Sequence, residues 1–137
     1  MRYVNNMNEY IDVKYISEKK GKGAFAKKII KKKTVIDVAN VILIPDNDYN
    51  KIRKTVLYDY CYIWGDSKKP GFKNAITLSI SQFINHSFKP NAKYLFDYNN
   101  NTMEFSAIKD IQEGEEITVN YNGRANDKTP IWFEVID

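Results

Sequence analysis

Short alternating apolar runs, separated by glycine, proline and asparagine, constrain the fold of this chain more than any other feature. The clearest pair lies within residues 91–108, where two alternating segments flank a turn at residues 98–102 and predict a hairpin. Residues 10–17 alternate in the same way, and the β-branched residues 34–45 predict either a strand pair or one long bent strand. The pattern therefore predicts a mostly β fold.

The middle of the chain carries mixed signals. One of the three polar residues 46–48 is expected to cap a helix over residues 49–55. Residues 57–64, LYDYCYIW, follow and are predicted as a strand. A spacing of two places three aromatic residues on one strand face, and the second and third of them are equally consistent with the core: Tyr60, Tyr62 and Trp64.

The second half of the chain adds short elements. Residues 75–80 predict a strand, residues 81–87 a short helical turn, and Gly114 a tight turn before another strand. Residues 107–117 also repeat the pattern of residues 26–36, with alanine, isoleucine and a second isoleucine at matching positions. We interpret this echo as one local device used twice, a short bend feeding a strand, because two copies cannot build a solenoid.

Length and charge bound the class of protein. The 137 residues fit one domain, and the net charge is +4 with many lysines near the N-terminus. Lysines outnumber arginines, which favours a solvated lysine face over a nucleic-acid footprint. No run of about 20 apolar residues is present, and the N-terminus lacks a secretory core. The lone Cys61 excludes an internal disulfide, so we expect an intracellular, reducing setting.

The stretch FINHSFKPNA places a polar pair, Asn85 and His86, inside an apolar run. A buried amide or imidazole without partners costs several kcal/mol, roughly, so both side chains should be held by specific bonds. These bonds go either to the protein or to a ligand. A metal site is not expected, because the chain has one histidine and one cysteine.

The order of four blocks resembles the SET domain family of protein-lysine methyltransferases. The blocks are KGKGAFA, LYDYCYIWG, SQFINHSFKPNA and AIKDIQEGEEITVNY, and the resemblance runs from about residue 13 to residue 132 of a single domain, 1–137. Its compact layout is similar to small stand-alone relatives without zinc-binding flanks. The resemblance implies several small β-sheets with short helical turns and a C-terminal pseudoknot. Lys33 departs from it, since most relatives have glycine at that bend.

The resemblance also implies S-adenosylmethionine as cofactor. Asn85 would bond its amino group, and His86 would meet the adenine mainly through its backbone, with the ring bonded internally. Tyr121 would orient the substrate amine beside the transferring methyl, and Tyr60 would line both pockets. Phe133 would either stack on the adenine or plug the end of the domain. Further residues implied to contact the cofactor are Lys20, Gly21, Lys22, Gly23, Gln82, Phe83 and Trp132.

Three functional hypotheses follow. The leading one is methylation of a lysine in a histone, a histone-like protein or another basic protein. The second is a SET-like module that binds without turnover, and the third is a small basic β-domain that binds nucleic acid through its lysines. The third leaves the NHSFKPNA block unexplained. No membrane association is expected, and a homodimer is a weak expectation for so short a chain.

Overall fold

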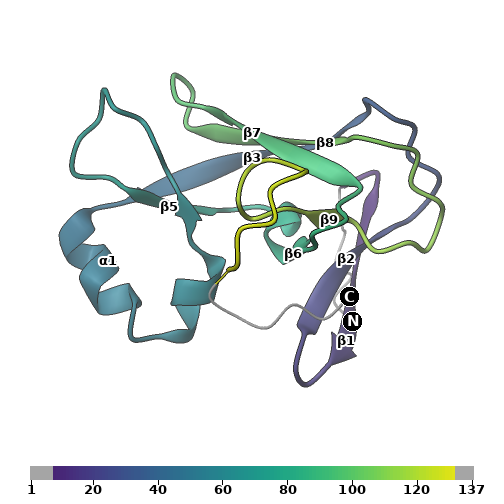
Figure 1. Cartoon of the computed structure of the whole chain (residues 1–137), viewed down its shortest axis with the longest axis horizontal. Helices are drawn as coiled ribbons and strands as arrows, with labels where there is room; N and C mark the ends of the chain where they lie inside the picture. The colour runs from purple at the N-terminus through teal and green to yellow at the C-terminus, as the bar shows by residue number, and fades with distance from the viewer. Residues whose placement is uncertain (1–7, 132–137) are drawn as a thin grey trace, which may run out of the picture.

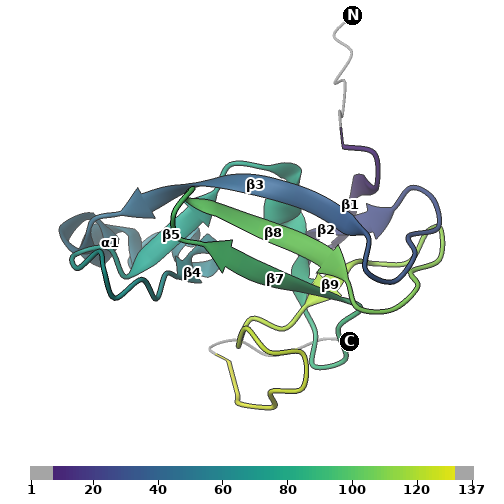
Figure 2. The ribbon, with the colours of Figure 1, turned by 90° about the horizontal axis from the view of Figure 1, so that it is seen from above.

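A computed structural model describes residues 8–131, and its largest unit is a five-stranded sheet in the order β4-β5-β3-β8-β7 (Figure 1). The central strand β3 (Val35–Ile44) is one long strand, which settles the alternatives left by the sequence. Its first half pairs with β8 and its second half with β5 (Asn74–Thr77). Strands β7 (Ala92–Asp97) and β8 (Thr102–Ala107) form the predicted hairpin, and Figure 2 shows them beside β3.

Two small sheets complete the predicted mostly β fold. Strands β1 (Ile11–Ser17) and β2 (Gly21–Ala26) form an antiparallel pair. Strands β6 (Asn85–His86) and β9 (Thr118–Val119) lie far apart in the sequence and pair in parallel near the middle of the molecule (Figure 1). This pairing joins the two segments that the predicted pseudoknot brings together.

The region before residue 64 corrects two predictions. Helix α1 (Asp46–Ile52) begins three residues earlier than expected, and no side chain caps it; Pro45 stands at the cap position instead. Pro45 has an extended ψ of 142°, and the first helical N–H, that of Asp46, donates to Gly71 O at 3.0 Å, so a loop carbonyl takes the place of a capping side chain for this donor.

The predicted strand over residues 57–64 is wrong in its first half. The Thr55 hydroxyl accepts a hydrogen bond from the Leu57 N–H and begins a 3₁₀ helix, η1 (Val56–Tyr60). Only β4 (Tyr62–Ile63) is extended, so the predicted common strand face does not form.

The next stretch follows the prediction more closely. Strand β5 ends at Thr77, three residues short of the expected end. The expected helical turn is confirmed as the 3₁₀ helix η2 (Ile80–Phe83), which leads into β6. Within residues 8–131 no helix is long and apolar enough to cross a membrane.

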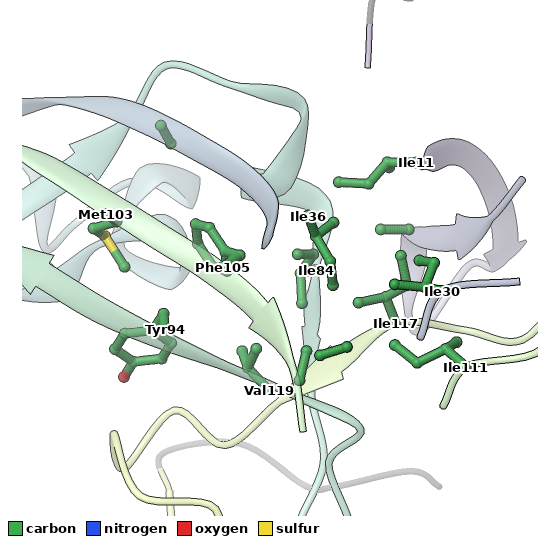
Figure 3. Close-up of a cluster of buried hydrophobic side chains, with 14 of the residues drawn as sticks. Ile11, Ile30, Ile36, Ile84, Tyr94, Met103, Phe105, Ile111, Ile117 and Val119 are labelled. Carbon is green, nitrogen blue, oxygen red and sulfur yellow. The ribbon is translucent and has the colours of Figure 1, made fainter. Parts of the chain in front are cut away.

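The core is built from side chains of distant segments, as Figure 3 shows. Phe105 and Met103 on β8 pack under the large sheet, while Ile84 and Val119 come from the two segments that meet at β6 and β9. All four are fully buried. The site described below is therefore supported from behind by a continuous apolar core.

The two echo segments, residues 26–36 and 107–117, lie against each other with reciprocal hydrogen bonds. The Lys33 N–H donates to Ala107 O and the Gly114 N–H donates to Ala26 O, each at 2.8 Å. Ile30 and Ile111 exchange two backbone bonds, also at 2.8 Å. The two segments thus form the same bend, and each supplies backbone carbonyls that accept hydrogen bonds from the N–H groups of the other.

Lys33 and Gly114 occupy equivalent positions in these bends and share a left-handed backbone, with φ of 74° and 84°. A residue with a Cβ pays about 1–2 kcal/mol there. The departure at Lys33 therefore keeps the bend that glycine makes in the second copy.

Candidate functional site

One cavity of about 460 Å³ gathers the motif residues, and its volume lies in the range of small-molecule sites. Its walls come from the β1–β2 turn, η1, η2, β6 and the segment after β9. Every predicted site residue lines it except Gly23, which lies behind it, and Trp132, which falls outside the described residues with Phe133. The lining residues that the sequence did not suggest are Glu18, Lys19, Val56 and Asp59.

The His86 ring is bonded inside the protein, as the resemblance implied. Its Nδ1 accepts a hydrogen bond from the Tyr121 N–H at 3.0 Å, and its ring centroid lies 5.3 Å from that of Tyr121. The ring also packs edge-on against Phe88 at 4.5 Å. His86 therefore joins the two distant segments, which answers why an imidazole stands in this apolar run.

The Asn85 side chain has protein partners for its nitrogen. Nδ2 donates to Lys22 O at 3.2 Å and to Glu116 Oε1 at 2.9 Å. Asn85 lines the cavity, whereas Glu116 does not. The amide is therefore fixed from the protein side while one of its faces remains available to a ligand.

Gly23 acts differently from the expectation. A Cβ at this position would lie 2.6 Å from Ile16 Cδ1 and 2.9 Å from Glu116 Oε1, closer than packed atoms approach. The space that glycine leaves is thus filled by the protein behind the cavity. Gly21 is the glycine of this loop that lines the cavity, and its left-handed φ of 70° favours glycine.

Gln82 lines the cavity but uses its polar atoms for structure. Its Oε1 accepts from the Thr77 N–H and hydroxyl at 3.0 and 2.7 Å, and its Nε2 donates to Tyr60 O at 3.0 Å. Gln82 therefore holds the end of β5 and the backbone of Tyr60 in place.

Tyr121 stands where the cavity meets the core. Its hydroxyl donates to Ile84 O at 2.9 Å. Burial is the largest cause that raises its pKa, with nearby Tyr94 and Tyr60 adding to it, and burial raises the pKa of Tyr94 to about 12. The Tyr121 phenol is therefore neutral at physiological pH, with its hydroxyl hydrogen directed at Ile84 O.

A second, narrow cavity of about 30 Å³ adjoins the first and shares Tyr60, Gln82 and Tyr121 with it. Tyr62 lines this narrow cavity, is 6% exposed, and has a buried hydroxyl without a hydrogen-bond partner among the described residues. Its ring centroid lies 6.1 Å from that of Tyr121. The sequence indicated Tyr62 only as a strand-face or core residue, because an alternating pattern does not show which cavity or partner a tyrosine hydroxyl faces.

A larger hollow of about 630 Å³ lies elsewhere, along β7 and the loop after β4. Of the four motif blocks only Gly65 lines it, and none of the predicted site residues does. The volume of a cavity therefore does not identify the site. The convergence of polar and aromatic motif residues on the 460 Å³ cavity identifies it.

Comparison with known proteins decides the family. The SET domain matches residues 21–122, about three-quarters of the chain. The chain belongs to the SET domain family. The class predicted from its motifs, a protein-lysine methyltransferase, is confirmed with it, and enzymes of this class use S-adenosylmethionine.

Individual relatives agree with this assignment. A Schizosaccharomyces pombe protein named histone-lysine N-methyltransferase, H3 lysine-37 specific, is 28% identical over 119 residues, which cover 86% of this chain and 74% of the relative. The crystal structure of a Plasmodium falciparum protein described as a histone methyltransferase is 26% identical, with a TM-score of 0.62 over 84% of this chain and 95% of its own.

A third similarity concerns the fold alone. A structure of ctPRC2 in an autoinhibited conformation, bound to S-adenosylmethionine, is 21% identical, with a TM-score of 0.68 over 83% of this chain and 15% of its own. These comparisons bear out the predicted SET fold.

Proposed function

We propose that this chain transfers a methyl group from S-adenosylmethionine, held in the 460 Å³ cavity, to the ε-amine of a lysine in a histone or another basic protein. The observation that carries the proposal is the convergence of Asn85 and Tyr121 on this cavity, with the narrow tyrosine-lined cavity beside Tyr121. The first cavity suits a cofactor, and the second suits an unbranched amine.

The cofactor side would be held by directed polar contacts. The Asn85 amide oxygen would accept from the ammonium group, and Gly21 would let the loop backbone approach the ligand without a Cβ. His86 lines the same cavity, and the ring bond to Tyr121 fixes its position. S-adenosylmethionine, when bound, supplies a methyl group activated by a sulfonium.

The tyrosine side would prepare the amine. A lysine in water is almost fully protonated at pH 7, with a pKa of about 10.4, and an apolar, aromatic channel lowers that pKa. The raised pKa of Tyr121 keeps its phenol protonated near neutrality, so the phenolate would not be the base, and the amine would lose its proton to solvent water as it enters the channel. Tyr121 and Tyr62 would then orient the neutral amine through their oxygens.

The substrate class rests on the named relatives and on the rim of the site. Both relatives are named for histone methylation, and histones are lysine-rich basic proteins. Glu18 and Asp59 line the larger cavity together with Lys19, Lys20 and Lys22, so that cavity as a whole does not favour a cation. Asp59 also lines the narrow cavity, which has no lysine or arginine among its described lining residues, so a cationic lysine would be attracted to the narrow side.

The test is transfer of a labelled methyl group. The purified chain is incubated with methyl-labelled S-adenosylmethionine and core histones, and mass spectrometry locates the added mass. Label on a lysine side chain is the expected result. Cofactor binding without transfer to any basic protein would favour the binding-module hypothesis instead, and absence of cofactor binding would end both. The single-domain organisation and the homodimer stay predictions.

A further inference from the structure

Behind the cavity lies a carboxylate that the motif analysis did not single out. Glu116 accepts a hydrogen bond from Asn85 Nδ2 at 2.9 Å, and its other oxygen lies 3.5 Å from Lys20 Nζ. Its side chain is only 21% exposed and does not line the cavity. Glu116 therefore acts on a ligand indirectly, through the two cavity-lining residues that it contacts, Asn85 and Lys20.

The orientation of the Asn85 amide follows from the chemistry of its neighbours. The amide nitrogen carries two hydrogens, and they meet two acceptors, Lys22 O and Glu116 Oε1. A backbone carbonyl and a carboxylate can only accept, so the nitrogen and not the oxygen must face them. The amide oxygen is consequently turned to the other side, toward the cavity that Asn85 lines.

The position of Glu116 is itself fixed by groups away from the cavity. The buried Asn91 donates from Nδ2 to Glu116 O at 2.8 Å, and its Oδ1 accepts from the Thr118 N–H at 2.9 Å. Room for the pair comes from Gly23, where a Cβ would lie 2.9 Å from Glu116 Oε1 and 3.0 Å from Asn85 Nδ2. Asn91 thus holds the backbone of Glu116, and Gly23 leaves the space in which the Glu116 carboxylate meets the Asn85 amide.

We infer that Glu116 is a positioning residue that makes the cavity selective for a ligand with a primary ammonium group. It does so by locking the Asn85 amide with its oxygen toward the ligand. This inference rests on the proposed function and adds the source of the selectivity. A glutamine at 116 could donate as well as accept, so only Lys22 O would still oppose the flipped amide, whose NH₂ would face the ammonium.

The experiment compares two probes, S-adenosylhomocysteine and its deaminated analogue, by calorimetric titration. The wild-type protein should bind the first at least about tenfold more tightly, the value of a hydrogen bond to a charged group. Glu116→Gln should lower this ratio at least about fivefold and change the affinity for the deaminated analogue less than about twofold. The matched control is Glu115→Gln, which removes an exposed carboxylate bonded to the Gln112 N–H and should keep the ratio.

A conservative variant separates orientation from folding. Glu116→Asp retains an acceptor-only group and should keep a higher ratio than Glu116→Gln. An unchanged ratio in Glu116→Gln, or an equal loss of affinity for both probes, would overturn the inference while leaving the proposed function intact. If the wild-type protein gives no binding signal with S-adenosylhomocysteine above the buffer control, the proposed function and the inference are both overturned.

Discussion

The two walls of the site differ in how their polar atoms are partnered. On the amide wall, formed by Lys22 and Asn85 with Glu116 behind them, the amide nitrogen donates to protein acceptors within 3.2 Å. On the tyrosine wall, formed by Tyr60, Tyr62 and Tyr121, the buried Tyr62 hydroxyl has no hydrogen-bond partner among the described residues. The amide wall would bind the cofactor through directed hydrogen bonds. The tyrosine wall would exclude water and leave the Tyr62 hydroxyl for an incoming amine.

The largest effect is expected on the tyrosine wall. Tyr121→Phe removes the oxygen that borders both cavities and should lower methyl transfer at least about 100-fold. Binding of S-adenosylmethionine should change less than about threefold, because the amide wall is intact. Single-turnover transfer and calorimetry measure the two quantities. Tyr98→Phe, on the hairpin outside the site, is the control, and equal losses in both quantities would erase the distinction between the walls.

The converse change tests the amide wall. Asn85→Ala removes the amide that faces the cavity and should weaken binding of S-adenosylmethionine about 10- to 100-fold. At saturating cofactor, transfer should recover to within about fivefold of wild type. Asn100→Ala removes an exposed amide bonded to Asp97 in the hairpin turn and should leave binding unchanged. Normal cofactor affinity in Asn85→Ala would remove the assigned role.

The tyrosine wall also predicts a dependence of stability on pH. Burial raises the pKa of Tyr62 and Tyr121 in the folded protein, and that of neighbouring Tyr94 to about 12, whereas the unfolded chain titrates near 10.0. The folded state therefore holds more protons above pH 10, and stability falls as pH rises, by about 1.4 kcal/mol per pH unit for each tyrosine. Urea unfolding between pH 9 and 11, roughly, measures the slope, and Tyr62→Phe should reduce it by one tyrosine's share. A flat profile would contradict the buried neutral phenols.

The smallest effect separates stability from function on one side chain. Tyr62→Phe deletes a buried hydroxyl that lacks a protein partner, so the free energy of unfolding should stay level or rise by about 1 kcal/mol while methyl transfer falls. Tyr94→Phe is the contrast, because its hydroxyl donates to Tyr121 O at 3.2 Å and its loss should cost about 1 kcal/mol. A destabilised Tyr62→Phe would show that its hydroxyl is satisfied in the folded chain.

The convergence of distant segments was predictable from sequence because it depends on the order of whole motifs. The motif blocks around His86 and Tyr121 implied that these two residues lie close together, and the hydrogen bond from the Tyr121 N–H to His86 Nδ1 shows that they do. The hairpin over residues 91–108 followed from strict alternation around a turn. Such features are encoded locally or by motif order, so one sequence suffices for them.

Other features depended on contacts that no local pattern encodes. The 3₁₀ helix η1 is an exception: its start is capped locally, since the Thr55 hydroxyl accepts from the Leu57 N–H, and the strand prediction rested on the aromatic residues instead. No motif singled out Glu116, and only its bond to Asn85, 31 residues away, reveals its place. The sequence indicated only that Tyr62 is a strand-face or core residue. An alternating pattern can predict that a ring is buried, but it does not show whether the hydroxyl of that ring has a hydrogen-bond partner.

The most direct measurement is a crystal structure of the chain with S-adenosylhomocysteine. The account predicts the ligand in the 460 Å³ cavity, with its amino group on the Asn85 oxygen and its sulfur on the side of Tyr121. Density for the ligand elsewhere, for example in the larger hollow along β7, would contradict the claim that two distant segments build one cofactor site.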